Sequence, residues 1–309
     1  MTASTIPSIG IDFGGTSIKL GVVKGTEVIA HAPSIATQEY GNPDQLIEAI
    51  AQFVNMLRLN HPEVQAIGMG MPGFVNFYQG SVYTLTNVPG WNNVPVRDML
   101  QAACGLPVYV ENDANCMAYA EWKLGAGKGK RHLVCLTLGT GVGSGLIVNG
   151  ELLRGATCSA GELGQTSIDY RGRLGHYGNR GIAADARTLY ASHGVDKAIV
   201  DCNPIALERA ALAGDEVAAQ VWRDLAVKLS CALMNCCYLL NPEAIIIGGG
   251  VAKAKTLLFQ PLQEIMKTQL AAPLVEHLEI LPAQFGTEAG ILGSAHLALN
   301  THFGETFRA

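Results

Sequence analysis

Two loops rich in glycine and threonine, each set between apolar runs, constrain the fold of this chain more than any other feature. Residues 9–16 read Ile-Gly-Ile-Asp-Phe-Gly-Gly-Thr, and residues 136–145 read Leu-Thr-Leu-Gly-Thr-Gly-Val-Gly-Ser-Gly. A second strand-like run follows each loop, at 18–23 and 146–148, so each loop is predicted to be the turn of a β-hairpin. A P-loop or a dinucleotide fingerprint would open a helix directly after the glycines, so neither of those motifs fits.

Both loops have the chemistry to hold phosphate. Glycine lacks a Cβ and reaches positive φ, so backbone N–H groups can close around phosphate oxygens, and threonine adds a hydroxyl donor. A carboxylate beside phosphates would repel them without a cation, so Asp12 is expected to bind Mg²⁺, directly or through water. Either loop alone could be an ordinary tight turn, but the presence of both favours a phosphate site. The predicted phosphate-binding residues are Gly14, Gly15, Thr16, Lys19, Gly139, Thr140, Gly141 and Gly143.

Length and composition narrow the class of protein. A chain of 309 residues is long enough for two domains with full cores. Charged residues make up 15% and the net charge is −5, without a basic run, so no nucleic-acid partner is expected. The start of the chain lacks the pattern of a signal peptide, and no apolar run approaches a membrane span. We therefore expect a cytoplasmic protein with a small-molecule partner and no membrane contact. The eight cysteines contain no Cys-x-x-Cys and are expected to be thiols, mostly in the core.

The first lobe is predicted to span residues 1–112. Its helix, over about 43–60, can be capped by Asn42 or Asp44 and carries an apolar stripe of 3.6-residue period. Its strands are predicted near 8–12, 17–23, 26–31, 64–71 and 108–110.

The second lobe is predicted to span residues 113–286. It begins with a helix at 114–124, restarts the hairpin pattern at 133, and contains a long helical stretch from about 215 to 240. A buried strand at 244–247 then runs into the glycine turn 248–250. A final helix, within about 287–309, is expected to pack back onto the first lobe.

The segment Glu111-Asn112-Asp113 is the strongest candidate for catalysis. It follows a short strand and precedes a helix, and a carboxylate beside an amide suits recognition of a polyol and deprotonation of one of its hydroxyls. Asp113 is the candidate base; it could also cap the following helix, and the two roles are compatible. Glu111 is less favoured because strand alternation points it away from Asn112. Three weaker motifs, at 68–73, 85–91 and 161–165, are each more often structural than functional.

Taken together and in order, these motifs resemble the ROK family (repressor, open reading frame, kinase) of the actin-like sugar-kinase superfamily. Residues 12–16 are similar to its first phosphate motif, 111–115 to its catalytic segment, 138–143 to its second phosphate motif and 241–251 to its adenosine motif. The resemblance implies an α/β, two-lobed actin-like (ribonuclease H-like) fold with an interdomain cleft, and a homodimer. Residues 85–91 are similar to the glucokinase-type sugar loop, which favours glucose.

By this resemblance the chain is expected to be an ATP:hexose 6-phosphotransferase of carbohydrate metabolism, at the entry to glycolysis, that uses ATP and Mg²⁺. Asp113 would take the proton from the sugar 6-hydroxyl, and Gly249 and Gly250 would lie at the adenosine. The sugar would be held by Asn87, Asn112, Asp113 and Glu162, with Gly73 beside them. Repressor members carry a helix-turn-helix ahead of the first phosphate loop, whereas only about ten residues precede it here, so a kinase is expected.

Alternatives remain for the sugar, for the phosphoryl donor and for the class of protein. The sugar could be an N-acetylhexosamine, mannose or fructose, and the donor could be polyphosphate. A non-catalytic sugar sensor is the alternative of another class.

The chain departs from the resemblance where the family usually builds a zinc site, from a histidine after Gly-Glu-x-Gly and three cysteines. Gln165 stands in place of the histidine, and Gly175, Tyr177 and Ile182 stand in place of the cysteines. Loss of all four ligands implies a loop stabilised in another way, so no zinc is expected, and His176 is expected to be structural.

The same departure affects the sugar residues. Gln165 can bond a hydroxyl but carries no charge. Ala184 occupies the place of a family glutamate, and its neighbour Asp185 is predicted to take that role.

Overall fold

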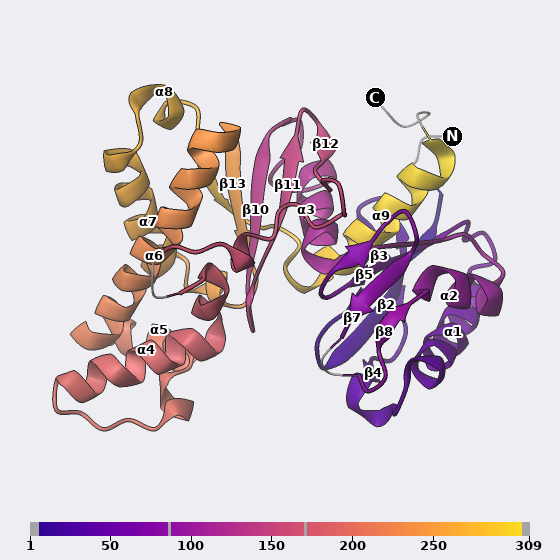
Figure 1. Cartoon of the computed structure of the whole chain (residues 1–309), viewed down its shortest axis with the longest axis horizontal. Coiled ribbons are helices and arrows are strands. Elements are labelled where there is room, and N and C mark those ends of the chain that lie inside the picture. The colour runs from indigo at the N-terminus through magenta and orange to yellow at the C-terminus, as the bar shows by residue number, and fades with distance from the viewer. Residues whose placement is uncertain (1–5, 86–87, 170–171, 305–309) are drawn as a thin grey trace. The chain divides into compact units, whose positions relative to one another are not determined.

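The computed structural model describes residues 6–85, 88–169 and 172–304 (Figure 1). The chain forms two compact units. Unit 1 comprises Met1–Lys128, Leu152–Ala160 and Phe285–Ala309, and unit 2 comprises Gly129–Glu151 and Gly161–Gln284. Each unit combines one main sheet with helices.

Unit 1 is built on a six-stranded sheet of order β3-β2-β1-β5-β9, with β4 paired to β2. Strands β1, β5 and β9 are parallel, whereas β1, β2 and β3 pair antiparallel. The β1–β2 pairing confirms that the first glycine loop is a hairpin turn. The strands are β1 (Ser8–Phe13), β2 (Ser17–Lys24), β3 (Glu27–His31), β4 (Ile35–Ala36), β5 (Ile67–Met71) and β9 (Val108–Asn112).

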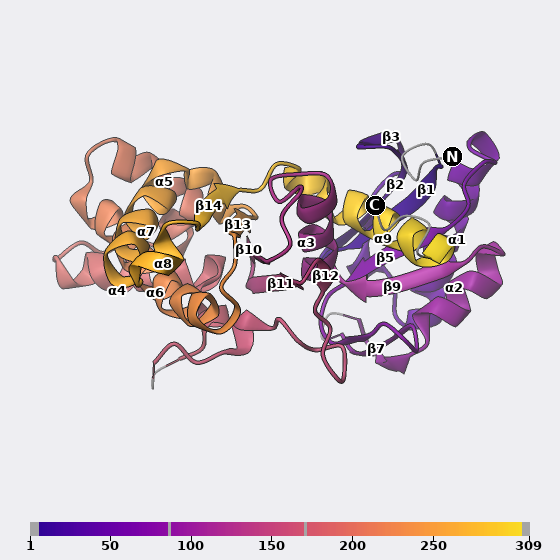
Figure 2. The ribbon, with the colours of Figure 1, turned by 90° about the horizontal axis from the view of Figure 1, so that it is seen from above.

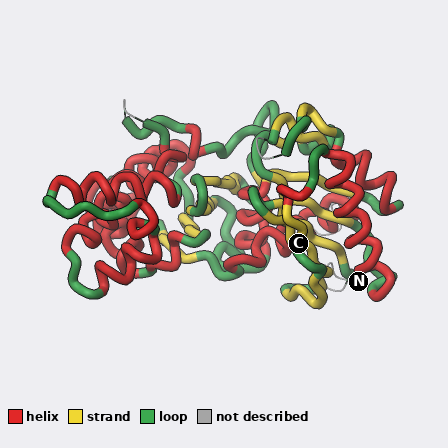
Figure 3. The backbone as a smooth tube through the Cα atoms, turned by 90° about the horizontal axis from the view of Figure 1, so that it is seen from below, coloured by secondary structure: helices red, strands yellow, loops and turns green. Residues whose placement is uncertain are grey.

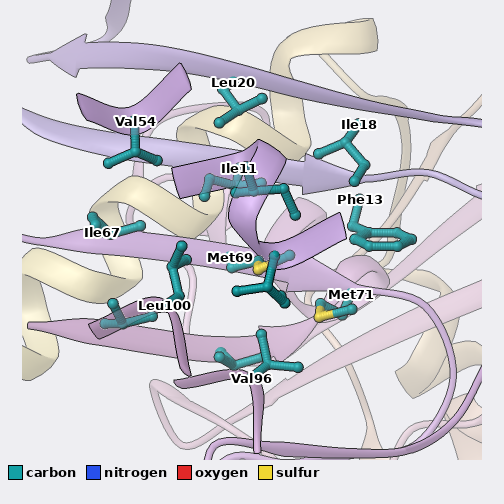
Figure 4. Close-up of a cluster of buried hydrophobic side chains, with 14 of the residues drawn as sticks. Ile11, Phe13, Ile18, Leu20, Val54, Ile67, Met69, Met71, Val96 and Leu100 are labelled. Atoms are coloured by element: carbon teal, nitrogen blue, oxygen red, sulfur yellow. The ribbon is translucent and has the colours of Figure 1, made fainter. Parts of the chain in front are cut away.

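One face of this sheet is covered by helices α1 (Pro43–Asn60) and α2 (Val96–Cys104). Asn42 caps α1 by accepting a hydrogen bond of 3.0 Å from the backbone N–H of Gln45, one of the two caps predicted. Alternate residues of β1 and β5 face these helices and form a fully buried core with Val54 and Leu100 (Figure 4). The labelled strand residues of this core are Ile11, Phe13, Ile18, Leu20, Ile67, Met69 and Met71.

The opposite face of the sheet carries glycines, and they let α9 (Ala289–Phe303) approach closely (Figure 2). A Cβ on Gly10 would lie 1.9 Å from the carbonyl oxygen of Ile291, and one on Gly68 would lie 1.8 Å from that of Ser294. Neither position tolerates a side chain. The final helix is thus part of unit 1.

Helix α3 (Asp113–Lys123) also belongs to unit 1, so the predicted boundary after residue 112 differs from that of the structure. The physical reason is its packing on α9: a Cβ on Gly293 would lie 1.7 Å from the carbonyl oxygen of Cys116, so the two helices touch backbone to backbone. Every residue of α3 from Ala114 to Glu121 is buried.

A small antiparallel sheet of order β6-β7-β8 completes unit 1. Its strands are β6 (Val75–Asn76), β7 (Ser81–Thr84) and β8 (Asn92–Val94). Strands this short show no usable alternation, so the sequence does not predict them.

Unit 2 contains a five-stranded sheet of order β12-β11-β10-β13-β14 and a group of helices, drawn red in Figure 3. Strands β10 and β11 pair antiparallel, which confirms the second hairpin, and β10 lies parallel to β13. The strands are β10 (Leu133–Leu138), β11 (Val142–Val148), β12 (Glu151–Leu152), β13 (Ala244–Gly248) and β14 (Glu279–Pro282). The helices are α4 (Asn179–Ser192), α5 (Pro204–Leu212), α6 (Glu216–Leu240), α7 (Thr256–Gln269) and α8 (Ala272–Val275).

All eight cysteines are free thiols, and only Cys231 is not fully buried, which confirms the sequence prediction. Within residues 6–85, 88–169 and 172–304, the helices are all too short or too polar to span a bilayer.

Candidate active site

The ends of three parallel strands in unit 1 bring together two predicted site carboxylates, Asp12 for metal binding and Asp113 as the base. In the sheet register Asp12 pairs with Gly70, and Gly70 pairs with Glu111, the residue before Asn112. A Cβ on Gly70 would lie 3.5 Å from the Cα of Asp113, an ordinary contact distance, so the turn after β9 lies directly against β5. The carboxyl ends of parallel strands are the usual place for a site in α/β proteins.

The buried thiol of Cys116 in α3 lies close to these carboxylates. Its pKa is raised well above the ordinary value, first by burial and then by the negative charges of Glu111, Asp113 and Asp12.

Asp12 lies in a site that suits a cation. Its carboxylate lies against the first turn of α9, where a Cβ on Gly290 would come within 2.6 Å of the Asp12 Cγ. Burial raises the pKa of Asp12, and the positive charge of Lys19, its cross-strand neighbour, partly offsets this. An oxygen ligand beside a glycine loop fits Mg²⁺, which is commonly bound through one carboxylate and waters.

Asn112 and Asp113 form the turn from β9 into α3. Asn112 is the N-cap: its Oδ1 accepts hydrogen bonds from the backbone N–H of Ala114 at 2.9 Å and of Asn115 at 3.1 Å. Its Nδ2 donates to the carbonyl oxygen of Gly73 at 3.1 Å, so two predicted sugar residues lie in contact. Asp113 is the first residue of the helix, and its Oδ1 also accepts from Ala114 N–H at 2.8 Å. The main capping role therefore falls to Asn112 rather than Asp113.

The first glycine loop is open at Gly15. A Cβ there would meet no described atom within 4 Å, and Gly15 is exposed, so the fold itself does not require glycine. The loop is held from behind by Thr37, which is fully buried. Thr37 Oγ1 donates to the carbonyl oxygen of Gly15 at 3.3 Å, and Thr37 N–H donates to that of Thr16 at 3.2 Å. Thr37 thus supports the loop from the core side, while Gly15 and Thr16 are exposed.

The second glycine loop, in unit 2, has the same open character. A Cβ on Gly139 or Gly141 would meet no described atom within 4 Å. The turn is closed by a hydrogen bond of 3.0 Å from Gly139 N–H to the carbonyl oxygen of Gly141. Thr140 at its tip is exposed, and Gly143 pairs with Thr137 in the ladder.

Two further segments of unit 2 lie against this loop. Gly249, at the predicted adenosine turn, has φ +86°, and a Cβ there would lie 2.3 Å from the carbonyl oxygen of Leu138. Asn179 N–H donates to the carbonyl oxygen of Gly139 at 2.8 Å. Both predicted nucleotide motifs of unit 2 are therefore adjacent, and Gly250 beside them is open.

Glu162 lies in a turn that Ser144 of β11 holds on both sides. Ser144 Oγ donates to the carbonyl oxygen of Gly161 and accepts from Leu163 N–H at 3.0 Å. Burial raises the pKa of Glu162. Ser144 is itself buried, so the turn is fixed by a side chain from the strand behind it.

The positions that replace the expected zinc ligands are closed by other contacts. Arg173 Nη1 donates to Gln165 Oε1 at 3.0 Å, and Ile182 is buried. A Cβ on Gly175 would lie 2.7 Å from the carbonyl oxygen of Gly164, which leaves no room for a side chain. In the part of the chain that the structure describes, no three His, Cys, Asp or Glu side chains gather around a possible metal position.

Asp185 is engaged elsewhere in unit 2. Its Oδ2 accepts a hydrogen bond of 2.6 Å from Lys228 Nζ, which also lies 4.4 Å from the centroid of the Tyr177 ring. The predicted role of Asp185 at the sugar would have to compete with this ion pair. Asn87, the remaining predicted sugar residue, lies outside the described residues.

Comparison with known proteins agrees with this arrangement. The model of the ROK family matches residues 8–301. The chain belongs to the ROK family.

This ROK protein is 34% identical to a glucokinase of Streptomyces coelicolor, over 94% of this chain and 97% of the relative. It is 32% identical to a glucokinase of Thermotoga maritima, over 94% and 96% of the two chains. Among solved structures, a ROK family glucokinase from Streptomyces griseus in complex with glucose and AMPPNP superposes with a TM-score of 0.80. That structure is 30% identical and covers 94% of this chain and 99% of its own. The predicted α/β fold class is thereby confirmed.

Three residues that the sequence did not single out hold the site in place. Thr37 supports the first loop, Ser144 supports the turn of Glu162, and Arg154 forms an ion pair with Glu111. Each acts through a contact between segments far apart in the chain. The sequence gives no local signal for any of them.

Proposed function

We propose that this protein is an ATP-dependent hexose kinase that transfers the γ-phosphoryl group to the 6-hydroxyl of glucose. The observation that carries the proposal is the placement of Asp12 and Asp113 at one end of the parallel strands β1, β5 and β9. One carboxylate beside an open glycine loop suits metal binding, and the other, at a helix start beside an amide, suits proton transfer. The glucose and AMPPNP bound by the Streptomyces griseus relative support this choice of sugar and donor.

In the proposed reaction Asp113 accepts the proton of the sugar 6-hydroxyl as its oxygen forms a bond to the γ-phosphorus. The bond from that phosphorus to the bridging oxygen breaks, and the products are the sugar 6-phosphate and ADP. Mg²⁺ would supply neutralisation of phosphate charge, and Asp12 would hold it, directly or through water. The chain's own residues contribute mainly alignment, which can supply about 7–11 kcal/mol of a barrier.

The sugar would be held by polar groups from both units. From unit 1 we assign Asn112, Asp113, Gly73 and Asn87, and from unit 2 Glu162, Gln165 and Asp185. Gln165 and Asp185 are the weaker members of this set, because Gln165 already accepts a hydrogen bond from Arg173 and Asp185 forms an ion pair with Lys228.

The nucleotide would be held by the two open loops and the adenosine turn. Gly15, Gly139, Gly141 and Gly250 have room on their Cβ side, so phosphate or ribose can approach the backbone of these loops closely. Gly14, Thr16, Lys19, Thr140, Gly143 and Gly249 complete the proposed set.

We further propose a cytoplasmic homodimer without zinc and without nucleic-acid or membrane partners. The zinc-free proposal rests on Gln165, Gly175, Tyr177 and Ile182, none of which is a usual zinc ligand. Treatment with a chelator, followed by addition of Mg²⁺, should leave turnover unchanged. Stoichiometric zinc in the purified protein would contradict the zinc-free proposal.

A panel of hexoses and phosphoryl donors tests the proposed function. Purified protein with ATP and Mg²⁺ should phosphorylate glucose with a higher kcat/KM than N-acetylhexosamines, mannose or fructose, and polyphosphate should not replace ATP. Preference for another sugar or for polyphosphate would change the substrate assignment. Binding of glucose without turnover of any hexose would favour a sugar sensor, which would have no need for both Asp12 and Asp113.

A further inference from the structure

A buried ion pair in unit 1 connects residues 152–160 to the turn that carries Asp113. Arg154 Nε donates to Glu111 Oε2 at 2.7 Å, and the Glu111 side chain is only 1% exposed. The Arg154 guanidinium lies over the ring of Phe77, with its Cζ 3.9 Å from the ring centroid. A planar guanidinium held by a carboxylate on one side and an aromatic face on another has a fixed orientation.

The other oxygen of Glu111 fixes the backbone around Asp113. Glu111 Oε1 accepts from Asn112 N–H at 2.9 Å, directly before Asp113. It also accepts from Asn115 Nδ2 at 3.0 Å, within the first turn of α3. Glu111 therefore holds the chain on both sides of the proposed base, and Arg154 is the cation that holds Glu111.

The path of the chain gives this ion pair a further consequence. Leu152–Ala160 belongs to unit 1, while the stretches on either side of it belong to unit 2. Ala160 N–H donates to the carbonyl oxygen of Arg154 at 3.0 Å, which closes the segment into a loop. Glu162, the proposed sugar residue of unit 2, follows two positions later. Arg154 is thus where this loop is both closed and anchored.

We propose that Arg154 is a positioning residue for phosphoryl transfer: through Glu111 it fixes the turn that presents Asp113 to the sugar hydroxyl. This inference rests on the proposed function. Without the guanidinium, Glu111 would be a buried charge without its cation, and such a group must find another partner at the expense of its neighbours. A small displacement of a reacting group lowers the rate strongly.

The expected signature is a loss of kcat with little change in sugar affinity. The side chain of Asn112 keeps its own bonds to Gly73, Ala114 and Asn115, which do not involve Arg154. Sugar binding through Asn112 should therefore survive when the ion pair is removed. The orientation of the Asp113 carboxylate toward the sugar hydroxyl should be lost.

The test compares Arg154→Gln, Arg154→Lys and the double variant Glu111→Gln/Arg154→Met with the parent enzyme, well below the melting temperature of each. Arg154→Gln should lower kcat about 10- to 100-fold, while the glucose Kd measured by calorimetry stays within about threefold. Arg154→Lys keeps the charge and should lose less. The double variant removes the buried charge together with its partner, so it should fold, and its kcat should still be reduced.

Asp98→Asn is the matched control, because Asp98 forms an exposed ion pair of 3.0 Å with Arg97 in the same unit. Its kcat should equal that of the parent. If the parent is active and kcat is unchanged in both Arg154→Gln and the double variant, the role of Arg154 is overturned and the proposed function stands. A raised glucose KM with unchanged kcat would also overturn the role of Arg154 alone. A parent without hexose turnover would overturn the proposed function and this inference with it.

Discussion

The side-chain amide of Asn112 donates a hydrogen bond of 3.1 Å to the backbone carbonyl of Gly73, and so joins the start of α3 to the turn after β5. Gly73 has φ +81°, in the region that favours glycine. The same amide caps α3 through its oxygen. One side chain therefore fixes two segments of the proposed sugar site.

Replacing Asn112 tests this double role. Asn112→Ala removes the cap and the bond to Gly73, so the free energy of unfolding should fall by about 1–2 kcal/mol. The KM for glucose should rise roughly tenfold or more, because polar groups built to bind hydroxyls discriminate strongly. Denaturant unfolding and steady-state kinetics measure the two effects. An unchanged KM would remove Asn112 from the sugar site.

Asp12→Asn should separate stability from activity. Burial raises the pKa of Asp12 above its ordinary 3.8, so the folded state binds the proton more tightly than the unfolded state. The stability that this shift contributes is present below about pH 3.8 and is lost as the pH rises through the folded pKa. At neutral pH the ionised carboxylate therefore opposes folding, and its replacement should raise the Tm of the metal-free protein.

Turnover should respond to Asp12→Asn in the opposite direction. We expect a loss of roughly 100-fold or more in kcat/KM, together with a weaker response to Mg²⁺. Scanning calorimetry and a Mg²⁺ titration check both parts. Parent-like Mg²⁺ dependence in the variant would contradict the assignment of Asp12.

Two glycines of unit 2 form a matched pair. Gly139→Ala adds a methyl group in open space, so stability should stay within about 0.5 kcal/mol while the KM for ATP rises. Gly249→Ala forces a side chain to φ +86° and against the carbonyl oxygen of Leu138, so it should destabilise by about 1–3 kcal/mol. An unaltered KM for ATP in Gly139→Ala would show that the open loop does not touch the nucleotide.

The glucose affinity should depend on the protonation of Glu162. Its pKa is raised above the ordinary 4.5 by burial, so on acidification Glu162 takes up its proton at a higher pH than an exposed glutamate does. The KM for glucose should rise over that range if the carboxylate accepts hydrogen bonds from sugar hydroxyls. Glu162→Gln should show a high KM without this pH dependence. The same dependence in both proteins would assign it to another group.

Much of the architecture is readable from the sequence because its signals are local. The cap at Asn42 and the apolar period of α1 define that helix as residues 43–60, as observed. The glycine loops mark their own hairpins. The short strands β6, β7 and β8 carry too few residues for a pattern. Helix α3 belongs to unit 1 mainly because it packs against α9, a contact between segments far apart in the chain.

The residues of the candidate site likewise divide into those with a local sequence signal and those without one. Asp12, Asp113 and the loop glycines belong to contiguous motifs and are found by reading along the chain. Thr37 and Arg154 are not, because their roles come from bonds that span 22 and 43 residues. Such contacts depend on the folded arrangement of several segments, so neither residue type nor spacing predicts them.

The most direct test of the central claim compares the parent with Asp113→Asn in glucose phosphorylation by ATP and Mg²⁺. Asn can still accept the hydrogen bond from Ala114 N–H, so the variant should fold and bind glucose in a calorimetric titration. Its kcat should fall about 100- to 10,000-fold, the range that a general base contributes. Parent-like turnover by Asp113→Asn would contradict the proposal that Asp113 is the base.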